Sequence, residues 1–222
     1  MRKTKRRLLY KKEMTEAIRI LLSMYPDQKS ELDFTNPLEL LVATILSAQC
    51  TDVRVNLVTP ALFARAKTAK DYAEIELEEL ESLVKTCGLY KSKAKNIRMT
   101  GRILEEEFGG RVPATREELM QLPGVGRKTA NVVLANAFDV PTFAVDTHVH
   151  RVSNRTGLAD AKTADETEQQ LMRHLPEDTW VGGHHALILH GRRVCKARKP
   201  MCEVCPLEGM CLFVKGKEPY KL

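Results

Sequence analysis

One ten-residue segment constrains the fold more than any other part of this sequence: Leu122-Pro-Gly-Val-Gly-Arg-Lys-Thr-Ala-Asn131. Pro123 fixes its own φ at about −65°, and Gly124 and Gly126 permit positive φ and a close approach of the backbone. Upstream, Thr115 to Glu118 has the pattern of a capping box, which predicts the start of a short helix. The segment therefore indicates a helix, a tight hairpin and a second helix. The amides at the start of the second helix suit an anionic oxygen such as a DNA phosphate.

Apolar residues recur at helical spacing through the rest of the chain, and no long stretch alternates between apolar and polar residues. Pro26 is expected to end the first helix, and a second capping box begins at Thr163. The sequence therefore predicts an all-α fold. The expected helices cover 14–25, 38–46, 52–65, 76–86, 91–108, 128–138, 146–155, 163–174 and 177–192.

The chain is basic, with 35 Lys and Arg against 29 Asp and Glu and a net charge of +6. This balance favours a polyanionic partner without requiring one. No apolar run approaches the roughly 20 residues that span a bilayer, so no membrane association is expected. Residues 1–12 contain seven Lys or Arg and no apolar signal segment, which predicts a cytoplasmic protein without disulfides. These charges suit either a solvated helix start or a DNA contact.

Four of the six cysteines lie within 17 residues near the C-terminus, in the pattern Cys-x6-Cys-x2-Cys-x5-Cys. Four thiolates suit a structural zinc ion or an iron–sulfur cluster, and the single short Cys-x2-Cys pair favours the cluster. The candidate ligands are Cys195, Cys202, Cys205 and Cys211. All four positions would be filled, so the site would be structural. Cys50 and Cys87 fall outside the pattern.

The first two of these cysteines close a loop that contains Lys196, Arg198 and Lys199. Anchoring both ends of a loop lowers the entropy lost when it binds a partner. The three basic side chains are therefore candidate contacts to a phosphate backbone, and the alternative is that they only solvate the metal site.

Three motifs together resemble bacterial endonuclease III: the hairpin with Lys128, Val145-Asp-Thr-His148, and the terminal cysteine pattern. That family consists of bifunctional DNA glycosylases and abasic-site lyases of the helix-hairpin-helix superfamily. The resemblance covers nearly the whole chain, including Leu46-Ser-Ala-Gln-Cys-Thr-Asp52 and Gly88-Leu-Tyr90. It implies a [4Fe-4S] cluster as cofactor, and double-stranded DNA with a damaged base or an abasic site as partner.

The resemblance also implies two helical lobes with the active site in a cleft between them. One lobe, residues 30–140, would be a six-helix barrel that includes the helix-hairpin-helix at about 115–138. The other would combine residues 1–29 with 141–222 and hold the cluster on the loop 195–211.

By the same resemblance, Lys128 is the nucleophile that attacks the sugar C1′ and forms a Schiff base. Lysine is ordinarily an ammonium at neutral pH, and a position in the first turn of a helix favours loss of that proton. Asp146 would stabilise positive charge on the sugar and assist proton transfer. From the residues alone, Lys128 could equally bind a phosphate, and Asp146 could serve only as a helix N-cap.

The resemblance also implies DNA contacts from Gln49, from Leu89 and from the hairpin. Gln49 would enter the gap left by the extruded nucleotide, and Leu89 would wedge against the opposite strand, although Leu89 could also be a core residue. The hairpin would bind phosphate through Gly124, Gly126 and Arg127. Met120 departs from the family, which usually has an acidic residue at this position, so the preferred lesion is left open.

Two other functions fit part of the pattern. The adenine-mismatch glycosylases share the hairpin, the aspartate and the cluster, but they usually lack a lysine at the position of Lys128. A non-catalytic DNA-binding module would need neither Lys128 nor Asp146. The favoured interpretation is a monomeric, nucleoid-associated bacterial repair enzyme that removes oxidised pyrimidines and then cleaves the strand by β-elimination.

Overall fold

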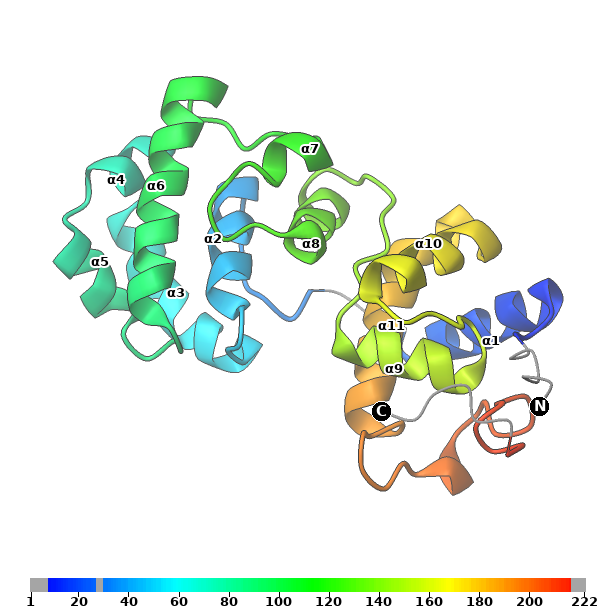
Figure 1. Ribbon diagram of the computed structural model, residues 1–222. Coiled ribbons are helices and arrows are strands. Elements are labelled where there is room, and N and C mark those ends of the chain that lie inside the picture. The colour runs from blue at the N-terminus through cyan, green and yellow to red at the C-terminus, as the bar shows by residue number, and fades with distance from the viewer. Residues whose placement is uncertain (1–7, 27–29, 217–222) are drawn as a thin grey trace. The chain divides into compact units, whose positions relative to one another are not determined.

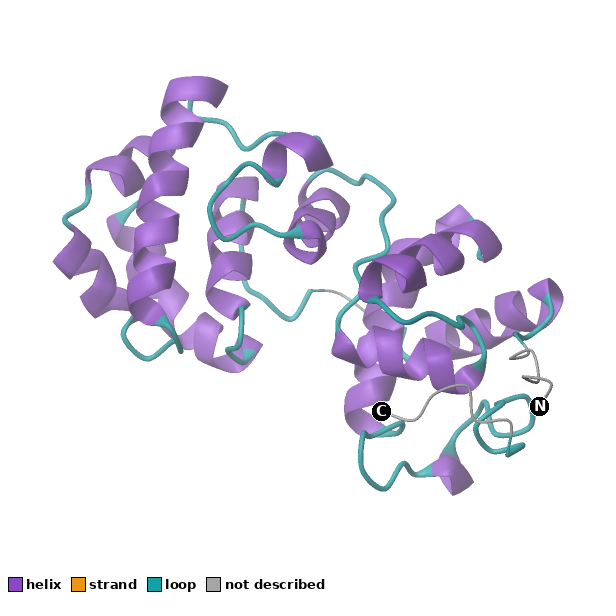
Figure 2. Ribbon diagram, in the orientation of Figure 1, coloured by secondary structure: helices purple, strands orange, loops and turns teal. Residues whose placement is uncertain are grey.

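The computed structural model describes residues 8–26 and 30–216. Within these ranges the protein contains eleven α-helices and two short 3-10 helices, and Figure 2 shows no strand among them. The predicted all-α fold is confirmed. The basic residues at positions 2–7 lie outside the described ranges.

The chain divides into two compact units, one formed by Ser30–Val140 and the other by the residues on either side of it. The first unit contains seven helices in its described part, shown from light blue to yellow-green in Figure 1. These are α2 (Pro37–Ser47), α3 (Asp52–Arg65), α4 (Ala69–Glu74), α5 (Leu77–Val84), α6 (Tyr90–Phe108), α7 (Arg116–Leu119) and α8 (Arg127–Ala137).

The core of this unit surrounds α2, whose residues Leu40 to Leu46 are all buried. This helix packs against α3, α6 and α8, while α4 packs against α6. Gly101 allows that second contact, because a Cβ atom there would lie 2.7 Å from the carbonyl oxygen of Ala69. The hairpin thus leads directly into α8, which packs against the buried helix α2.

The second unit joins the N-terminal helix to the C-terminal third of the chain. Helices α1, α9 and α10 all pack in this unit, and α11 contacts both α1 and α9. Gly183 of α11 permits the close crossing of α1, since a Cβ atom there would lie 2.9 Å from Ile18 Cδ1. The elements are α1 (Lys11–Met24), α9 (Thr147–Thr156), α10 (Ala164–His174), η1 (Glu177–Thr179), α11 (Trp180–Arg193) and η2 (Cys202–Val204).

The structure corrects two sequence-based predictions. Helix α4 is absent from the predicted set because six residues are too few to show helical periodicity, although Thr68 and Asp71 form a capping box. The helix expected over 177–192 is instead η1 followed by α11. Of the two hairpin glycines, which both permit positive φ, Gly124 uses the left-handed region and Gly126 has φ −94°.

Candidate active site and cluster loop

The hairpin is shaped by its backbone. Gly124 has φ +81°, and a Cβ atom at this position would lie 2.8 Å from Asn96 Nδ2, so both conformation and space require glycine. The turn closes where the amide of Val125 donates to the carbonyl of Leu122 at 3.1 Å. The tip is therefore shaped by α6 and by a local backbone hydrogen bond.

Helix α8 begins directly after this turn. Gly126 is its N-cap, in extended conformation, and its carbonyl accepts the amide of Ala130 at 2.9 Å. Glycine brings no side chain to cap the first turn, and among the described residues no side chain beyond its two chain neighbours lies within 4 Å of its missing Cβ. The first amides of an α-helix have no partner inside the helix, so this end suits an anion. Lys128 is the second residue of α8 and is exposed.

A side-chain hydrogen bond links α7 to α8. The Arg116 guanidinium donates from Nε to Asn131 Oδ1 at 2.9 Å, and Asn131 is buried. Both helices of the helix-hairpin-helix are thus held together beside the turn, which keeps the start of α8 in place.

Two exposed turns lie side by side in the same unit. Gln49 has φ +53° and Leu89 has φ +59°, so both adopt the left-handed conformation that non-glycine residues rarely adopt. A Cβ atom on Gly88 would lie 3.4 Å from the carbonyl oxygen of Gln49, so the two backbones approach closely. Leu89 is 59% exposed, which excludes the alternative that it is a core residue. Strained, exposed turns of this kind often belong to binding sites.

A buried lysine, Lys93, binds the end of α2 next to these turns. Lys93 is 4% exposed and donates from Nζ to the carbonyl of Leu46 at 2.8 Å, near the end of α2. Burial lowers its pKa, which the nearby thiols of Cys50 and Cys87 partly offset. Lys93 therefore caps α2 just before the Gln49 turn.

Asp146 belongs to the other unit, at the start of α9. It is the N-cap of this helix, and its Oδ1 accepts the amide of Val149 at 2.8 Å. The side chain is half-buried. One carboxylate oxygen thus fixes the side chain, and a carboxylate has further lone pairs with which to bind a cation or a proton.

Helix α9 also holds the cluster loop, residues 195–211. Arg151 is buried and donates from Nη2 to the carbonyl oxygens of Gly191 at 2.9 Å and Cys195 at 3.2 Å. One turn later, Arg155 donates to the carbonyl oxygens of Lys196 at 2.7 Å and Ala197 at 2.9 Å. Sequence reasoning missed both arginines. No local signal in the sequence could have found them, because the residues that they contact lie 40–44 positions further along the chain.

The four C-terminal thiols line one small cavity together with Arg155 and His190. Burial raises the pKa of the Cys202, Cys205 and Cys211 thiols, that of Cys205 to about 11. Neutral thiols are poor ligands, so the positive charge of bound iron must hold them as thiolates. Within residues 8–26 and 30–216, no three His, Cys, Asp or Glu side chains are grouped closely enough to hold a single metal ion. The thiols around one shared cavity suit the larger iron–sulfur cube.

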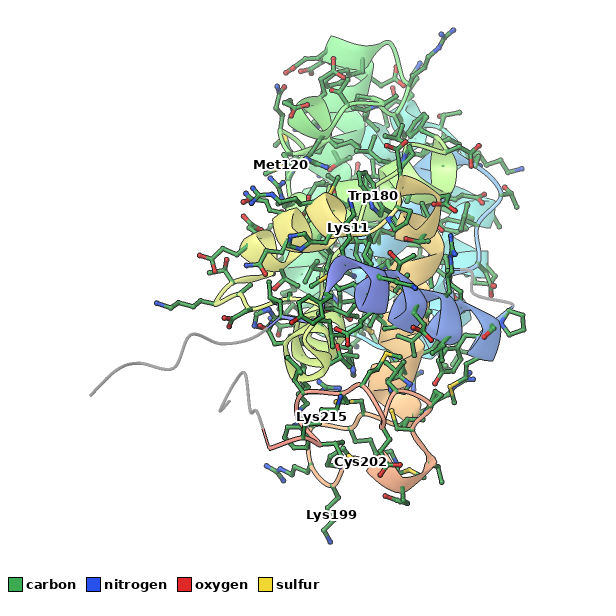
Figure 3. The ribbon with its side chains drawn as sticks, turned by 90° about the vertical axis from the view of Figure 1, so that its right-hand side faces the viewer. Lys11, Met120, Trp180, Lys199, Cys202 and Lys215 are labelled. Carbon is green, nitrogen blue, oxygen red and sulfur yellow. The ribbon has the colours of Figure 1, made fainter. Side chains whose placement is uncertain are left out.

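The three basic residues of the loop are exposed. Lys199 has φ +53°, and Figure 3 shows its side chain extending outward from the loop that carries Cys202. Arg155 anchors the backbone at Lys196 and leaves the lysine side chain outside. The loop thus presents Lys196, Arg198 and Lys199 to solvent, and a phosphate backbone could bind there.

The predicted site residues fall into three local groups. Gly124, Gly126, Arg127 and Lys128 form the hairpin and the start of α8, and Gln49 and Leu89 lie together on neighbouring turns of the same unit. Asp146 lies in the other unit, on the helix that binds the cluster loop. Nine residues, 138–146, connect α8 to α9.

Family models match both parts of the chain. Residues 42–177 match the HhH-GPD superfamily of base excision DNA repair proteins, and residues 195–211 match the iron–sulfur binding domain of endonuclease III. A curated endonuclease III of Bacillus subtilis is 51% identical over 189 residues, which are 85% of this chain and 86% of that protein. The Escherichia coli endonuclease III is 50% identical over 85% of this chain and 89% of its own length.

The chain belongs to the endonuclease III family. It is a base excision repair DNA glycosylase with abasic-site lyase activity, and it carries a [4Fe-4S] cluster. These matches confirm the predicted family, activity and cofactor, and the cluster replaces the zinc alternative.

Solved structures agree with this assignment. A trapped endonuclease III–DNA covalent intermediate has a TM-score of 0.89 at 46% identity and covers 95% of this chain and 99% of its own. A thermostable thymine-DNA glycosylase has a TM-score of 0.85 at 23% identity, which shows a shared fold. DNA is therefore the partner of this endonuclease III family member. No helix in the described part of the chain is long and apolar enough to cross a membrane.

Proposed function

We propose that Lys128 is the nucleophile and Asp146 the assisting acid–base group of the glycosylase and lyase reactions. The supporting observation is the position of Lys128, exposed in the first turn of α8 directly behind the hairpin. A structural relative was trapped as a covalent intermediate with DNA, which is the kind of species that a lysine nucleophile forms.

The reaction divides into two steps. The neutral amine of Lys128 attacks C1′, the bond from C1′ to the base breaks, and the base leaves with the bonding electrons and takes up a proton. The nitrogen then loses its proton, and opening of the sugar ring gives a protonated Schiff base. This iminium makes the 2′ hydrogen acidic, so removal of that proton expels the 3′ phosphate by β-elimination.

Asp146 supplies negative charge as positive charge develops on the sugar, and it accepts or returns the proton that the amine must lose. Its hydrogen bond to the amide of Val149 orients the carboxylate and leaves lone pairs for this work. The N-cap role and the catalytic role are compatible, because the amide occupies one oxygen.

We further propose how duplex DNA is held. Gln49 fills the gap left by the extruded nucleotide and Leu89 wedges against the opposite strand, since both project from exposed left-handed turns. The amides at Gly124 and Gly126, with Arg127, bind phosphate at the hairpin. Lys196, Arg198 and Lys199 bind phosphate from the cluster loop.

The cluster has a structural role in this proposal. Cys195, Cys202, Cys205 and Cys211 hold it, and the cluster in turn orders the loop that presents the basic side chains. No step of base removal or elimination changes an oxidation state, so the chemistry belongs to Lys128 and Asp146.

Borohydride trapping on a duplex with one abasic site tests the nucleophile. Reduction of the Schiff base gives a stable covalent adduct with the unaltered protein. Lys128→Ala is expected to give none, while Lys67→Ala, an exposed lysine on the same unit, traps as the unaltered protein does. Strand cleavage by elimination in Lys128→Ala would overturn the assignment.

Asp146→Asn separates the two roles of the aspartate. Asparagine caps a helix about as well as aspartate, so stability and cluster absorption are expected to stay unchanged. Base removal is expected to slow by roughly 10²–10⁴-fold, the usual worth of a positioned acid or base. An unchanged single-turnover rate of base removal would show that Asp146 acts only as the N-cap of α9.

Oxidised pyrimidines are the proposed substrates, and the enzyme is proposed to act as a monomer on the nucleoid in the cytoplasm. A panel of single-lesion duplexes measures the preference. Met120, which is 45% exposed at the end of α7, is the residue to vary in that panel. Met120→Glu restores the acidic side chain usual in the family and is expected to change the order of preferred lesions. The sedimentation coefficient of the DNA complex tests whether one protein molecule binds each duplex.

A further inference from the structure

A buried tyrosine and a buried histidine form a hydrogen-bonded row that ends at one cluster cysteine. Tyr25 Oη lies 3.3 Å from Nδ1 of His190, and Nε2 of the same ring lies 3.5 Å from Cys205 Sγ. Tyr25 is 5% exposed and His190 is fully buried. Water therefore does not compete for either contact, and the two ring nitrogens each have one protein partner here.

The backbone around His190 holds the ring in this position. His190 lies in the last turn of α11, and its carbonyl accepts the amides of Val194 at 2.9 Å and Cys195 at 2.8 Å. The carbonyl of His190 thus binds both the C-cap residue of α11 and the first residue of the cluster loop. A ring attached at this point keeps its direction toward Cys205 better than a ring on a loop would.

The chemistry of the three groups fixes where the protons lie. A cysteine that binds iron is a thiolate, which accepts hydrogen bonds and donates none. Nε2 of His190 must then carry the hydrogen. The ring is fully buried, which disfavours its charged form, so Nδ1 is the bare nitrogen. A phenol keeps its proton at neutral pH because tyrosine has an ordinary pKa of about 10, and Tyr25 therefore donates to Nδ1.

We infer that Tyr25 and His190 are positioning residues for the cluster: the tyrosine fixes the tautomer, and the histidine donates an N–H···S hydrogen bond to Cys205. The inference rests on Cys205 as a ligand, as proposed above. Hydrogen bonds to ligand sulfur stabilise the more electron-rich state of an iron–sulfur cluster and so raise its reduction potential.

This row also connects two distant parts of the sequence. Tyr25 follows directly after α1 and lies 165 positions before His190 in the sequence. Arg193 lies over the Tyr25 ring at 5.7 Å, which adds a contact to the face of the ring and leaves the hydroxyl to His190. The N-terminal helix therefore has a defined connection to the cofactor, and its loss can be measured at the cluster.

Resonance Raman spectroscopy of the cluster-loaded protein tests the hydrogen bond without any substitution. The Fe–S(Cys) stretching bands are expected to shift between H₂O and D₂O, because the ring N–H exchanges its proton. His190→Leu removes the donor and is expected to abolish the part of the shift that arises at Cys205. It is also expected to lower the midpoint potential in film voltammetry.

A conservative variant separates hydrogen bonding from packing. The amide nitrogen of glutamine can occupy the place of Nε2, so His190→Gln is expected to restore most of the potential and of the isotope shift. Equal potentials in the unaltered protein, His190→Leu and His190→Gln would overturn the inference. So would a loss in His190→Gln as large as that in His190→Leu.

Tyr25→Phe tests the tautomer and stays informative where His190→Leu fails to load a cluster. It is expected to shift the potential in the same direction by a smaller amount, because Nδ1 loses its donor. Tyr72→Phe is the matched control, since Tyr72 is equally buried and its hydroxyl has no hydrogen-bond partner among the described residues. A Tyr25→Phe protein that matches Tyr72→Phe in potential and isotope shift would refute the role of Tyr25.

Discussion

The hairpin and the cluster loop are both proposed to bind DNA phosphate, but they obtain their shapes in opposite ways. The hairpin lies between two helices and closes through local backbone hydrogen bonds and a positive φ at Gly124. The loop 195–211 contains only η2 and is held by side chains from α9 and α11.

This difference separates two ways of preparing a binding surface. A segment whose conformation is fixed by its own backbone hydrogen bonds, like the hairpin, needs only a packed helix next to it to stay in place. A segment that lacks regular structure must have its ends fixed by other groups, here two arginines and the cluster. We therefore expect the hairpin to tolerate loss of the cluster, and the loop to depend on it.

Loss of a cluster ligand is expected to have the largest effect and tests that dependence directly. Cys211→Ser removes the most buried of the four thiols, so we expect loss of nearly all visible cluster absorption and rapid proteolysis within the loop. Hydrogen exchange at the hairpin amides should stay as slow as in the loaded protein. Equal loss of protection in both segments would show that the hairpin also depends on the cofactor.

Substitution in the hairpin is expected to have the reverse pattern. Gly124→Ala forces a side chain into the left-handed region and against Asn96, which should cost about 2–4 kcal/mol of unfolding free energy. Visible cluster absorption per molecule should not change. Thermal denaturation and the visible spectrum measure the two effects.

Gly126→Ala is the matched control, because Gly126 has φ −94° and no atom within 4 Å of its missing Cβ. We expect a change of less than about 1 kcal/mol in stability, since alanine is only a weaker cap here. Weaker DNA binding without loss of stability would locate the phosphate at this amide. Equal destabilisation by both alanines would contradict the structural reason given for Gly124.

Substitution of Arg155 is expected to have a smaller effect on the cluster loop. Arg155→Met keeps the stem of the side chain but removes its two hydrogen bonds to carbonyl oxygens of the loop. We expect a loss of about 1–3 kcal/mol and faster bleaching of the cluster in air, with the hairpin unaffected. Bleaching at the unaltered rate would show that the cluster alone orders the loop.

The smallest structural effect is expected from the loop's basic side chains. Replacing Lys196, Arg198 and Lys199 by alanine should change stability by about 0.5 kcal/mol or less, because all three are exposed. Duplex affinity should fall, and the slope of log affinity against log salt should lessen by roughly one for each phosphate that the variant no longer neutralises. An unchanged slope would mean that the charges only solvate the loop.

Local patterns predicted much of the fold. Apolar spacing gave α3 at its observed limits, Asp52–Arg65, and the capping box at Thr163 gave the start of α10. Helix α4 was not predicted, since its six residues are too few for a helical periodicity to be read. The sequence shows that both hairpin glycines permit positive φ, but only the structure shows that Gly124 uses it and Gly126 does not.

The candidate site was predictable where chemistry depends on spacing in the sequence. The four cysteines and the pair Lys128 and Asp146 came from motifs of this kind. The hydrogen bonds of Arg151 and Arg155 to the loop could not be predicted from such motifs. Neither could the hydrogen bonds that join Tyr25, His190 and Cys205. Those contacts join residues far apart in the chain, and no periodicity in the sequence specifies tertiary neighbours at that distance.

The packing of α1 against α11 has a consequence for synthesis of the chain. The two helices are separated by 155 residues, 25–179, so at roughly 5–20 residues per second α1 is made about 8–30 s before α11. During that time its apolar face, with Ile18 and Leu21, has no partner from α11. The hairpin unit can be finished first on the ribosome, and the cofactor can be received only after translation has passed Cys211.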